Sequence, residues 1–124
     1  MDPQIKKGSL ELCILMMLHE KDCYGYEVSK EIGNLLEVKE GTIYLILQRL
    51  EKTEYVKSYI KESESSKPRK YYKLSLNGIK RMESLVDDYS TINGVINKYM
   101  KKQKSKGDKN GKKWIYESTI WFIR

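Results

Sequence analysis

Apolar side chains recur at helical spacing three times within the first part of the chain. The stretch LELCILMMLHE (10–20), which Ser9 could cap, is apolar on several sides, as expected for a helix in a core. Residues 25–36 follow with an amphipathic pattern, whose apolar positions are Val28, Ile32, Leu35 and Leu36. A third pattern starts at residue 40, and its inner stripe consists of Ile43, Ile46, Leu47 and Leu50. This part of the chain therefore predicts three helices.

The period then changes from helical to alternating. The stretch YVKSYIKES (55–63) is rich in β-branched and aromatic residues, which favours a strand. After the polar turn SESSKP, the stretch RKYYKL (69–74) predicts a returning strand with Tyr72 and Leu74 on one face and Tyr71 on the other. Three helices followed by a hairpin are the order of a winged helix-turn-helix, in which the hairpin is the wing.

A long helix is predicted after Ser75. Its apolar residues recur every three or four positions, close to the 3.5-residue repeat that packs one helix against another. Because the preceding domain already uses its own apolar faces, we expect the partner to be a second copy of the chain. The predicted interface residues are Met82, Leu85, Val86, Tyr89, Ile92, Ile96 and Tyr99.

These patterns predict a mainly α fold with a small β-hairpin, which is an α+β class. We expect a winged helix-turn-helix domain over residues 1–76, a dimerisation helix over 77–104, and a basic, aromatic tail over 105–124. Residues 101–113 are rich in Lys, Gly and Asn and look linker-like or disordered, whereas the end, WIYESTIWFIR, is aromatic and β-prone. The tail could add phosphate affinity, lie at a membrane interface, or be a remnant without a biological role.

The net charge of +7 comes from the end of the chain. Residues 1–97 contain 15 basic and 15 acidic side chains, whereas the remaining 27 residues contain 9 basic and 2 acidic ones. A DNA-binding face on the folded body must therefore arise from local clustering of charge. The chain lacks a run of about 18 apolar residues and an apolar signal core near its start, so we expect a cytoplasmic protein with no membrane partner.

Nothing in the sequence favours catalysis, a metal site or another cofactor. The only histidine, His19, has no convincing partner for acid–base chemistry. Cys13 and Cys23 lack metal-binding or redox spacing and are expected to be buried or half-buried thiols. We therefore expect a binding protein and not an enzyme.

Three segments, in this order and at these separations, resemble the PadR family of bacterial transcriptional regulators: YGYEVSKEI, EGTIYLILQRLEKTEYV and KPRKYYKLSLNG. The resemblance runs from about Gly8 to Met100, and the single short C-terminal helix is similar to the small subfamily that includes multidrug-sensing repressors. The sequence departs from the family where many relatives have proline at Leu45 and glycine near Glu54. The resemblance implies a homodimeric repressor that binds DNA.

A recognition helix in the major groove of DNA explains why the third helix has Thr42, Tyr44, Leu45 and Gln48 off its apolar stripe. Thr42 and Gln48 can form hydrogen bonds, Leu45 can contact a thymine methyl, and Tyr44 can reach a phosphate or a thymine methyl. The open N–H groups at the start of this helix can bind a phosphate. The expected DNA-binding residues are Tyr26, Lys30, Lys39, Gly41, Thr42, Tyr44, Leu45, Gln48, Lys67, Arg69 and Lys70.

Several of these side chains also have a purely structural interpretation. Tyr44 could pack on the wing, Leu45 could be an ordinary exposed leucine, and Arg49 could form a structural ion pair instead of contacting DNA. Tyr71 and Tyr72 could pack in the core and at the base of the wing. The same fold could also serve as a protein-interaction module without sequence-specific DNA binding, and salt dependence would distinguish the two functions.

The resemblance also implies an effector site between two protomers. Tyr89 matches the aromatic residue that stacks on planar ligands, Asp87 and Asp88 could attract a cationic compound, and Leu12 and Met16 could line the cavity. The alternative is that Tyr89 is an interface residue and both acids are solvated. The expected partners are therefore double-stranded DNA with a pseudo-palindromic operator, a second copy of the chain, and a small planar aromatic or cationic effector.

Overall fold

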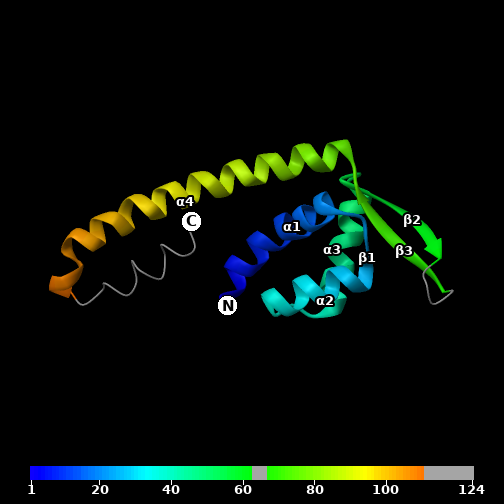
Figure 1. Ribbon diagram of the computed structural model, residues 1–124, viewed down its shortest axis with the longest axis horizontal. Coiled ribbons are helices and arrows are strands. Elements are labelled where there is room, and N and C mark those ends of the chain that lie inside the picture. The colour runs from blue at the N-terminus through cyan, green and yellow to red at the C-terminus, as the bar shows by residue number, and fades with distance from the viewer. Residues whose placement is uncertain (63–66, 111–124) are drawn as a thin grey trace. The chain divides into compact units, whose positions relative to one another are not determined.

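The computed structural model describes residues 1–62 and 67–110, with side chains as far as Lys102. Its elements are α1 (Pro3–Glu20), β1 (Cys23–Tyr24), α2 (Gly25–Leu36), α3 (Glu40–Lys52), β2 (Val56–Glu62), β3 (Pro68–Leu74) and α4 (Leu76–Asn110) (Figure 1). This order confirms the predicted winged helix followed by a long final helix. The chain divides into two compact units, Met1–Ser84 and Leu85–Arg124.

Helix α1 begins earlier than its apolar pattern suggests. It starts at Pro3, because Asp2 Oδ1 accepts hydrogen bonds from the N–H groups of Gln4 (2.9 Å) and Ile5 (3.4 Å). The prediction that Ser9 caps this helix is wrong. The Ser9 hydroxyl lies inside the helix and donates to the carbonyl of Ile5 at 2.9 Å. The additional turns place two lysines, Lys6 and Lys7, at the start of α1.

Helices α2 and α3 form the predicted helix-turn-helix. Val28 and Ile32 are buried, as expected, but the prediction of a buried Leu35 is wrong, since this side chain is 70% exposed. Leu35 lies in the last turn of α2 and lines a groove between α1 and α2 instead of the core. The chain then reverses at Glu37, whose φ of 56° is left-handed and ends the helix.

The hairpin forms as predicted, and β1 adds a strand that the sequence did not indicate. The antiparallel sheet has the order β1-β3-β2. Tyr71 on β3 lies opposite both Tyr24 on β1 and Tyr59 on β2. Tyr72 and Leu74 are buried and Tyr71 is half-buried, which confirms that they lie on opposite faces.

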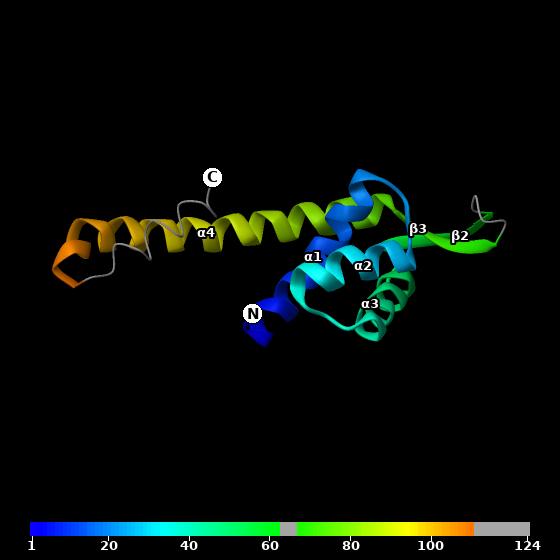
Figure 2. The same cartoon turned by 60° about the horizontal axis from the view of Figure 1, so that its bottom comes forward.

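The core of the first unit lies where the three helices meet the base of the sheet. Helix α1 packs against α2 and β3, α2 packs against α3, and α3 packs against β2. The β2–β3 hairpin extends away from these helices (Figure 2). The side chains that are at most 1% exposed are Ile14, Leu15, Cys23, Val28, Ile43, Leu47, Leu50 and Val56.

The first turns of α4 belong to the winged-helix body. The N–H of Gly78 donates to Ser75 Oγ at 3.0 Å, so Ser75 caps α4. A Cβ at Gly78 would lie 2.0 Å from the carbonyl oxygen of Tyr55, so only glycine fits this close approach. Met82, one turn later, is 8% exposed. The first compact unit therefore continues to Ser84 and does not stop at the expected boundary of residue 76.

Helix α4 continues to Asn110, beyond its expected end at residue 104. The backbone of residues 105–110, which we expected to belong to a linker-like tail, is helical. Lys and Gln at residues 101–104 are good helix formers and favour this continuation, whereas Gly107 and Asp108 do not. Residues 111–124, including WIYESTIWFIR, lie outside the described residues. Over residues 1–62 and 67–110, no helix combines the length and apolar character needed to cross a bilayer.

Candidate nucleic-acid interface

The outer face of α3 carries uncharged side chains that can contact base edges. Ile43 and Leu47 on the inner face are 0% exposed and hold the helix on the core. Thr42 and Gln48 are exposed on the other side, and Leu45 is 67% exposed. This arrangement presents two hydrogen-bonding side chains and one apolar side chain to solvent, which is the chemistry that base readout in the major groove needs.

The backbone at the start of α3 is accessible to a ligand. The Lys39 side chain does not cap the helix, although Lys39 occupies the capping position. An added Cβ at Gly41 would meet no atom within 4 Å, so the backbone there is accessible. The first N–H groups of a helix lack intrahelical partners and attract anions. Glu40 in this turn opposes an anion, so the neighbouring cations must supply the attraction.

Tyr44 packs against the start of α2. A Cβ at Gly25 would lie 2.4 Å from Cε1 of Tyr44, so the tyrosine ring occupies the space of a missing side chain. Burial raises the pKa of the Tyr44 phenol, and the nearby Glu40 carboxylate raises this pKa further. The packing interpretation of Tyr44 is therefore supported, and its ring lies against Gly25 at the start of α2.

A hollow of about 510 Å³ lies between the start of α2, the middle of α3 and strand β3. It brings five of the expected DNA-binding residues together from three elements, and Tyr24, Gly25 and Tyr72 complete the lining. Phenols, an amide and cations around one hollow suit the oxygens of a phosphate backbone. The five residues are Tyr26, Tyr44, Gln48, Arg69 and Lys70.

Two cations beside this hollow are held by aromatic rings. The Arg69 guanidinium carbon lies 4.3 Å from the ring centroid of Tyr24, and Lys30 Nζ lies 5.7 Å from that of Tyr26. A cation over a ring face is attracted by the ring's quadrupole and keeps its charge. Lys67 is exposed at the start of the returning strand segment. Among the residues that the structure describes, neither Arg69 nor Lys30 has a carboxylate within ion-pair distance, so both supply positive charge.

Lys70 is more strongly engaged within the protein. Its Nζ lies 3.1 Å from Glu51 Oε1, and this hydrogen bond raises the pKa of Lys70. The pKa of the Glu51 carboxyl is lowered first by the hydroxyl of Ser58 and then by Lys70. Lys70 therefore shares its charge with Glu51 and offers less to an external phosphate than Arg69 does.

Arg49 has the structural role that the sequence left open. Its guanidinium lies 3.7 Å from Glu11 Oε2 on α1, and Arg81 Nε on α4 lies 3.1 Å from Glu11 Oε1. This finding supports the ion-pair interpretation of Arg49.

The start of α1 adds cations that sequence reasoning missed. A second hollow, of about 410 Å³, is lined by residues of α1 and α3 that include Lys6, Lys7 and Thr42. Lys6 Nζ donates to the carbonyl oxygen of Glu37 at 2.9 Å. The Asp2-Pro3 pair, a typical helix start, could have revealed that these lysines lie on a helix beside the recognition helix.

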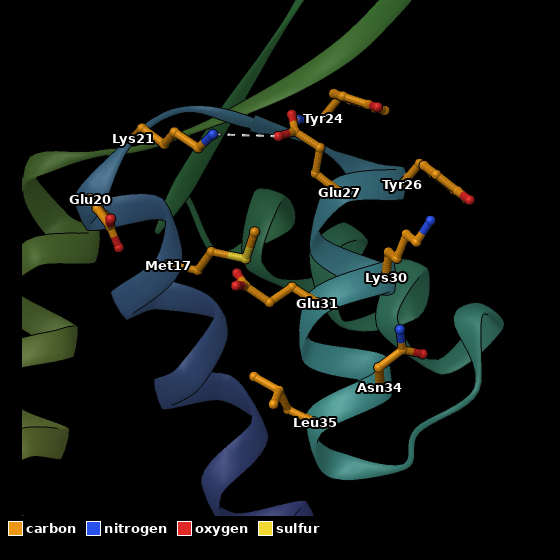
Figure 3. Close-up of a pocket in the computed structure, with 10 residues that line it drawn as sticks. All are labelled: Met17, Glu20, Lys21, Tyr24, Tyr26, Glu27, Lys30, Glu31, Asn34 and Leu35. Atoms are coloured by element: carbon orange, nitrogen blue, oxygen red, sulfur yellow. Dashed lines mark hydrogen bonds and ion pairs between the residues drawn. The ribbon is translucent and has the colours of Figure 1, made fainter.

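An acidic groove lies between α1 and α2, on the other side of α2 (Figure 3). In this groove Glu31 and Leu35 extend from α2 towards α1, whereas Tyr26 and Lys30 extend away from α1 (Figure 3). Lys21 pairs with Glu27 at 3.6 Å, and no ion pair of Glu31 is formed within the described part of the chain. The glutamates of this groove repel phosphate. The side of α2 that faces α1 is therefore less suited to DNA than the side that carries Tyr26 and Lys30.

The two cysteines have no reactive arrangement. Cys23 is 0% exposed, and burial raises the pKa of its thiol to about 11. Cys13 is half-buried, and burial also raises its thiol pKa. Both cysteines match the prediction of buried or half-buried thiols.

The expected effector residues lie in both compact units. On α1, Leu12 is 9% exposed and Met16 is 51% exposed. On α4, Asp88 is exposed and Tyr89 is half-buried. Their grouping around a ligand stays a prediction.

The expected dimer-interface residues lie along α4. Met82 is 8% exposed in the single chain, so little of its side chain is left for a partner. Leu85, Val86 and Tyr89 are half-buried. The exposed members of the set are Ile92 (57%), Ile96 (44%) and Tyr99 (55%).

Comparison with known proteins agrees with this fold. The profile of the transcriptional regulator PadR-like family matches residues 14–84. A relative named "Uncharacterized protein X" from Lysinibacillus sphaericus is 36% identical over 100 residues, covering 77% of this chain and 92% of the relative.

Solved structures show the same likeness. A PadR-like transcriptional regulator from Bacillus cereus has a TM-score of 0.72 and 31% identity, and the match covers 77% of this chain and 95% of that one. A PadR family transcription regulator from Clostridium difficile has a TM-score of 0.66 and 38% identity, covering 73% and 97% of the two chains. With its family profile and its winged-helix fold in agreement, the chain belongs to the PadR-like family of transcriptional regulators.

Proposed function

We propose that the chain is a sequence-specific, homodimeric DNA-binding repressor whose recognition helix is α3. The observation that carries this proposal is the position of α3: Thr42, Leu45 and Gln48 are exposed on it, and Gln48 lines a hollow together with Arg69 and Lys70. Side chains on α3 would read base edges in the major groove, and the cations beside it would bind the flanking phosphates. This role needs no catalytic group or cofactor, and it places the protein in the cytoplasm.

Two copies related by a two-fold axis would read two half-sites. The apolar residues Ile92, Ile96 and Tyr99 recur along α4 at three- and four-residue spacing and are exposed in the single chain, which supports self-association. Two recognition helices about 34–36 Å apart would require a pseudo-palindromic operator. Sedimentation equilibrium should give a dimer at micromolar concentration, and Ile92→Glu with Ile96→Glu should give a monomer.

DNA binding is tested by fluorescence anisotropy with a duplex from the protein's own promoter and a scrambled duplex of equal length. We expect the promoter duplex to bind at least about a thousandfold more tightly. A Thr42→Ala/Gln48→Ala variant should lose this preference while it keeps its fold. A folded dimer that binds both duplexes equally would overturn the proposal.

A protein-interaction module is the second candidate function. The acidic groove between α1 and α2, with Leu35 70% exposed, favours it. The two functions differ in salt dependence, because binding to DNA releases counterions and gives a steep negative slope of log affinity against log salt. A flat slope with a captured protein partner would favour the interaction module.

An effector would act by changing the populations of dimer states that differ in DNA affinity. We assign the effector contact to Tyr89 with Asp88, and to Leu12 and Met16 on α1. Titration calorimetry with a planar cationic dye should show binding to the wild type and to Tyr89→Phe, and at least about fivefold weaker binding to Tyr89→Ala. Equal affinities in all three proteins would rule out stacking on Tyr89.

A further inference from the structure

The sheet has a solvent-facing side that the recognition helix does not use. Strand residues alternate between the two faces, and Cys23, Val56, Tyr72 and Leu74 lie on the buried one. We call the other side the outer sheet face. Every described strand residue on it is either a tyrosine or a cation.

The tyrosines form one continuous row across the three strands. Tyr71 lies opposite Tyr24 and Tyr59 in the register of the sheet. The ring centroids of Tyr59 and Tyr71 are 5.7 Å apart, and the ring planes differ by only 15°. The centroids of Tyr24 and Tyr71 are 5.6 Å apart. The row therefore crosses the full width of the sheet.

The Tyr59 ring lies along the surface of the sheet and does not project away from it. Its hydroxyl donates to Asp22 Oδ2 at 2.7 Å, and Asp22 directly precedes β1, which is two strands away from β2. Two strand spacings are about 9.5 Å, so the side chain can span them only when it lies along the surface. The hydrogen bond holds the ring in this position before any partner binds, which reduces the entropy lost on binding.

Two pairs of like charges border this row. Lys57 lies opposite Lys73 on one side, and Lys61 lies opposite Arg69 on the other. Like charges directly opposite each other destabilise a sheet. The two pairs are four residues apart along β2, which is about 13 Å. Because the folded body has no net charge over residues 1–97, this concentration of cations is local and suits a partner with spaced negative charges.

We propose that the outer sheet face binds single-stranded nucleic acid, with a base stacked on Tyr59 and phosphates at the two pairs of cations. Aromatic side chains between cations are the chemistry that such surfaces use, because every base has a face that can stack. A duplex suits the tyrosines less well, since its bases are already paired and stacked inside the helix. This surface differs from the proposed operator interface on α3, although Tyr24 and Arg69 at its edge also line the hollow beside α3.

The test uses the full chain and fluorescence anisotropy with labelled oligothymidylate and oligouridylate of about 15 nucleotides, near the upper end of common site sizes. Tyr59→Ala should weaken binding to both oligonucleotides by about fivefold or more, as loss of one stacked base predicts. Tyr59→Phe keeps the ring and should stay within about twofold of the wild type. The matched control is Ile60→Ala, since Ile60 is 67% exposed on the same strand but on the opposite face.

The cations are tested by Lys57→Gln/Lys73→Gln, compared with Lys52→Gln/Lys80→Gln, which makes the same change in charge at exposed sites outside the sheet. The first pair should lower the salt slope of single-strand binding by about one to two, and the second should change it by less than half as much. Both double variants remove exposed side chains, so circular dichroism should show an unchanged fold.

A non-operator duplex of equal length separates this proposal from ordinary electrostatic attraction. We expect Tyr59→Ala to leave duplex binding within about twofold, and Thr42→Ala/Gln48→Ala to leave single-strand binding unchanged. The proposal would be overturned if Tyr59→Ala weakened duplex and single-strand binding to the same extent. It would also be overturned if Tyr59→Ala bound both oligonucleotides as tightly as the wild type. Failure of operator binding with intact single-strand binding would instead count only against the proposed repressor function.

Discussion

The outer face of α3 and the outer sheet face are both open to solvent but differ in chemistry. The α3 face presents Thr42, Leu45 and Gln48, which carry no charge, whereas the strand residues of the outer sheet face are tyrosines and cations. Side chains that reach base edges distinguish one base from another, and cations that contact phosphates attract any polynucleotide. Under the two proposed functions, the α3 face would discriminate between sequences and the outer sheet face would contribute general affinity.

The contacts that hold the two faces in place also differ. Helix α3 rests on fully buried side chains and on the contact between Tyr44 and Gly25. The sheet is supported near its base by the buried Val56 and Tyr72, but further along the hairpin it depends on contacts such as Ser58–Glu51 and Lys70–Glu51. We therefore expect substitutions under α3 to change stability most, and substitutions in the sheet to change mainly charge-dependent properties.

The largest expected effect comes from Leu47→Ala, compared with Leu45→Ala on the same helix. Leu47 is 0% exposed, so its truncation should lower the free energy of unfolding by about 2–5 kcal/mol. Leu45 is 67% exposed, so its truncation should change stability by less than about 0.5 kcal/mol but should weaken operator binding. Urea denaturation measures the first difference. Equal stability losses would mean that α3 does not have distinct inner and outer faces.

Gly25→Ala tests the contact beneath the recognition helix. The new Cβ would lie 2.4 Å from Cε1 of Tyr44, so the ring must shift, and we expect a loss of about 1–3 kcal/mol. Gly41→Ala is the control, because nothing lies within 4 Å of its added Cβ; it should be neutral or stabilising by up to about 1 kcal/mol. Thermal or urea unfolding measures the change in stability of each variant. A Gly25→Ala protein as stable as the wild type would show that Tyr44 does not need this space.

Gln48→Ala and Arg69→Gln compare discrimination with attraction. Gln48→Ala should reduce the preference for the operator over a point-mutated operator by about 1–3 kcal/mol and leave the salt slope unchanged. Arg69→Gln should weaken all duplexes similarly and reduce the salt slope by about one. Anisotropy titrations at several salt concentrations measure both quantities. If the two variants exchanged these effects, the proposed roles of helix and sheet would be reversed.

Glu51→Gln tests the support of the hairpin through pH. Hydrogen bonds from Ser58 and Lys70 lower the pKa of Glu51 from its ordinary 4.5, so its contribution to stability is present above about pH 4.5 and is lost as pH falls through the lowered pKa. Because both partners are partly exposed, the effect should not exceed about 1 kcal/mol at neutral pH. The stability curves of wild type and variant should converge in acid. Curves that stay parallel would exclude this linkage.

The smallest expected effect is spectroscopic. The hydrogen bond to Asp22 raises the pKa of the Tyr59 phenol to about 12. Because the pKa is raised, the hydrogen bond between Tyr59 and Asp22 stabilises the folded state fully below pH 10, the ordinary pKa of tyrosine. This stabilisation is lost as the pH rises through about 12. Ultraviolet titration should show a tyrosine that ionises near pH 12, and both Tyr59→Phe and Asp22→Asn should remove this step. An unchanged titration curve in Tyr59→Phe would contradict the position of this ring.

Elements with a long periodic pattern could be predicted from sequence, and so could the alternation along the hairpin. Strand β1 could not, because two residues are too short to show a period and Tyr24 becomes a strand residue only by pairing with Tyr71. Leu35 fits the apolar stripe of α2, yet nothing in the sequence indicates that α1 and α3 leave it uncovered. Burial at the end of a helix depends on its neighbours and not on its own pattern.

The candidate interface could be predicted residue by residue but not as a surface. The side chains of α3 were identified because they interrupt its apolar stripe. The ion pair of Arg49 with Glu11 joins residues that are far apart in sequence, so only the fold reveals it. The opposed pairs Lys57–Lys73 and Lys61–Arg69 likewise depend on strand register, which alternation alone does not fix.

Glu11 has a consequence for how the winged-helix body can move. One carboxylate lies within ion-pair distance of Arg49 on α3 and of Arg81 at the root of α4. A displacement of either helix relative to α1 must lengthen one of these two bonds or carry the other arginine along. Glu11 therefore links the recognition helix to the first turns of α4 within the winged-helix body, and Glu11→Gln would weaken both ion pairs with a single substitution.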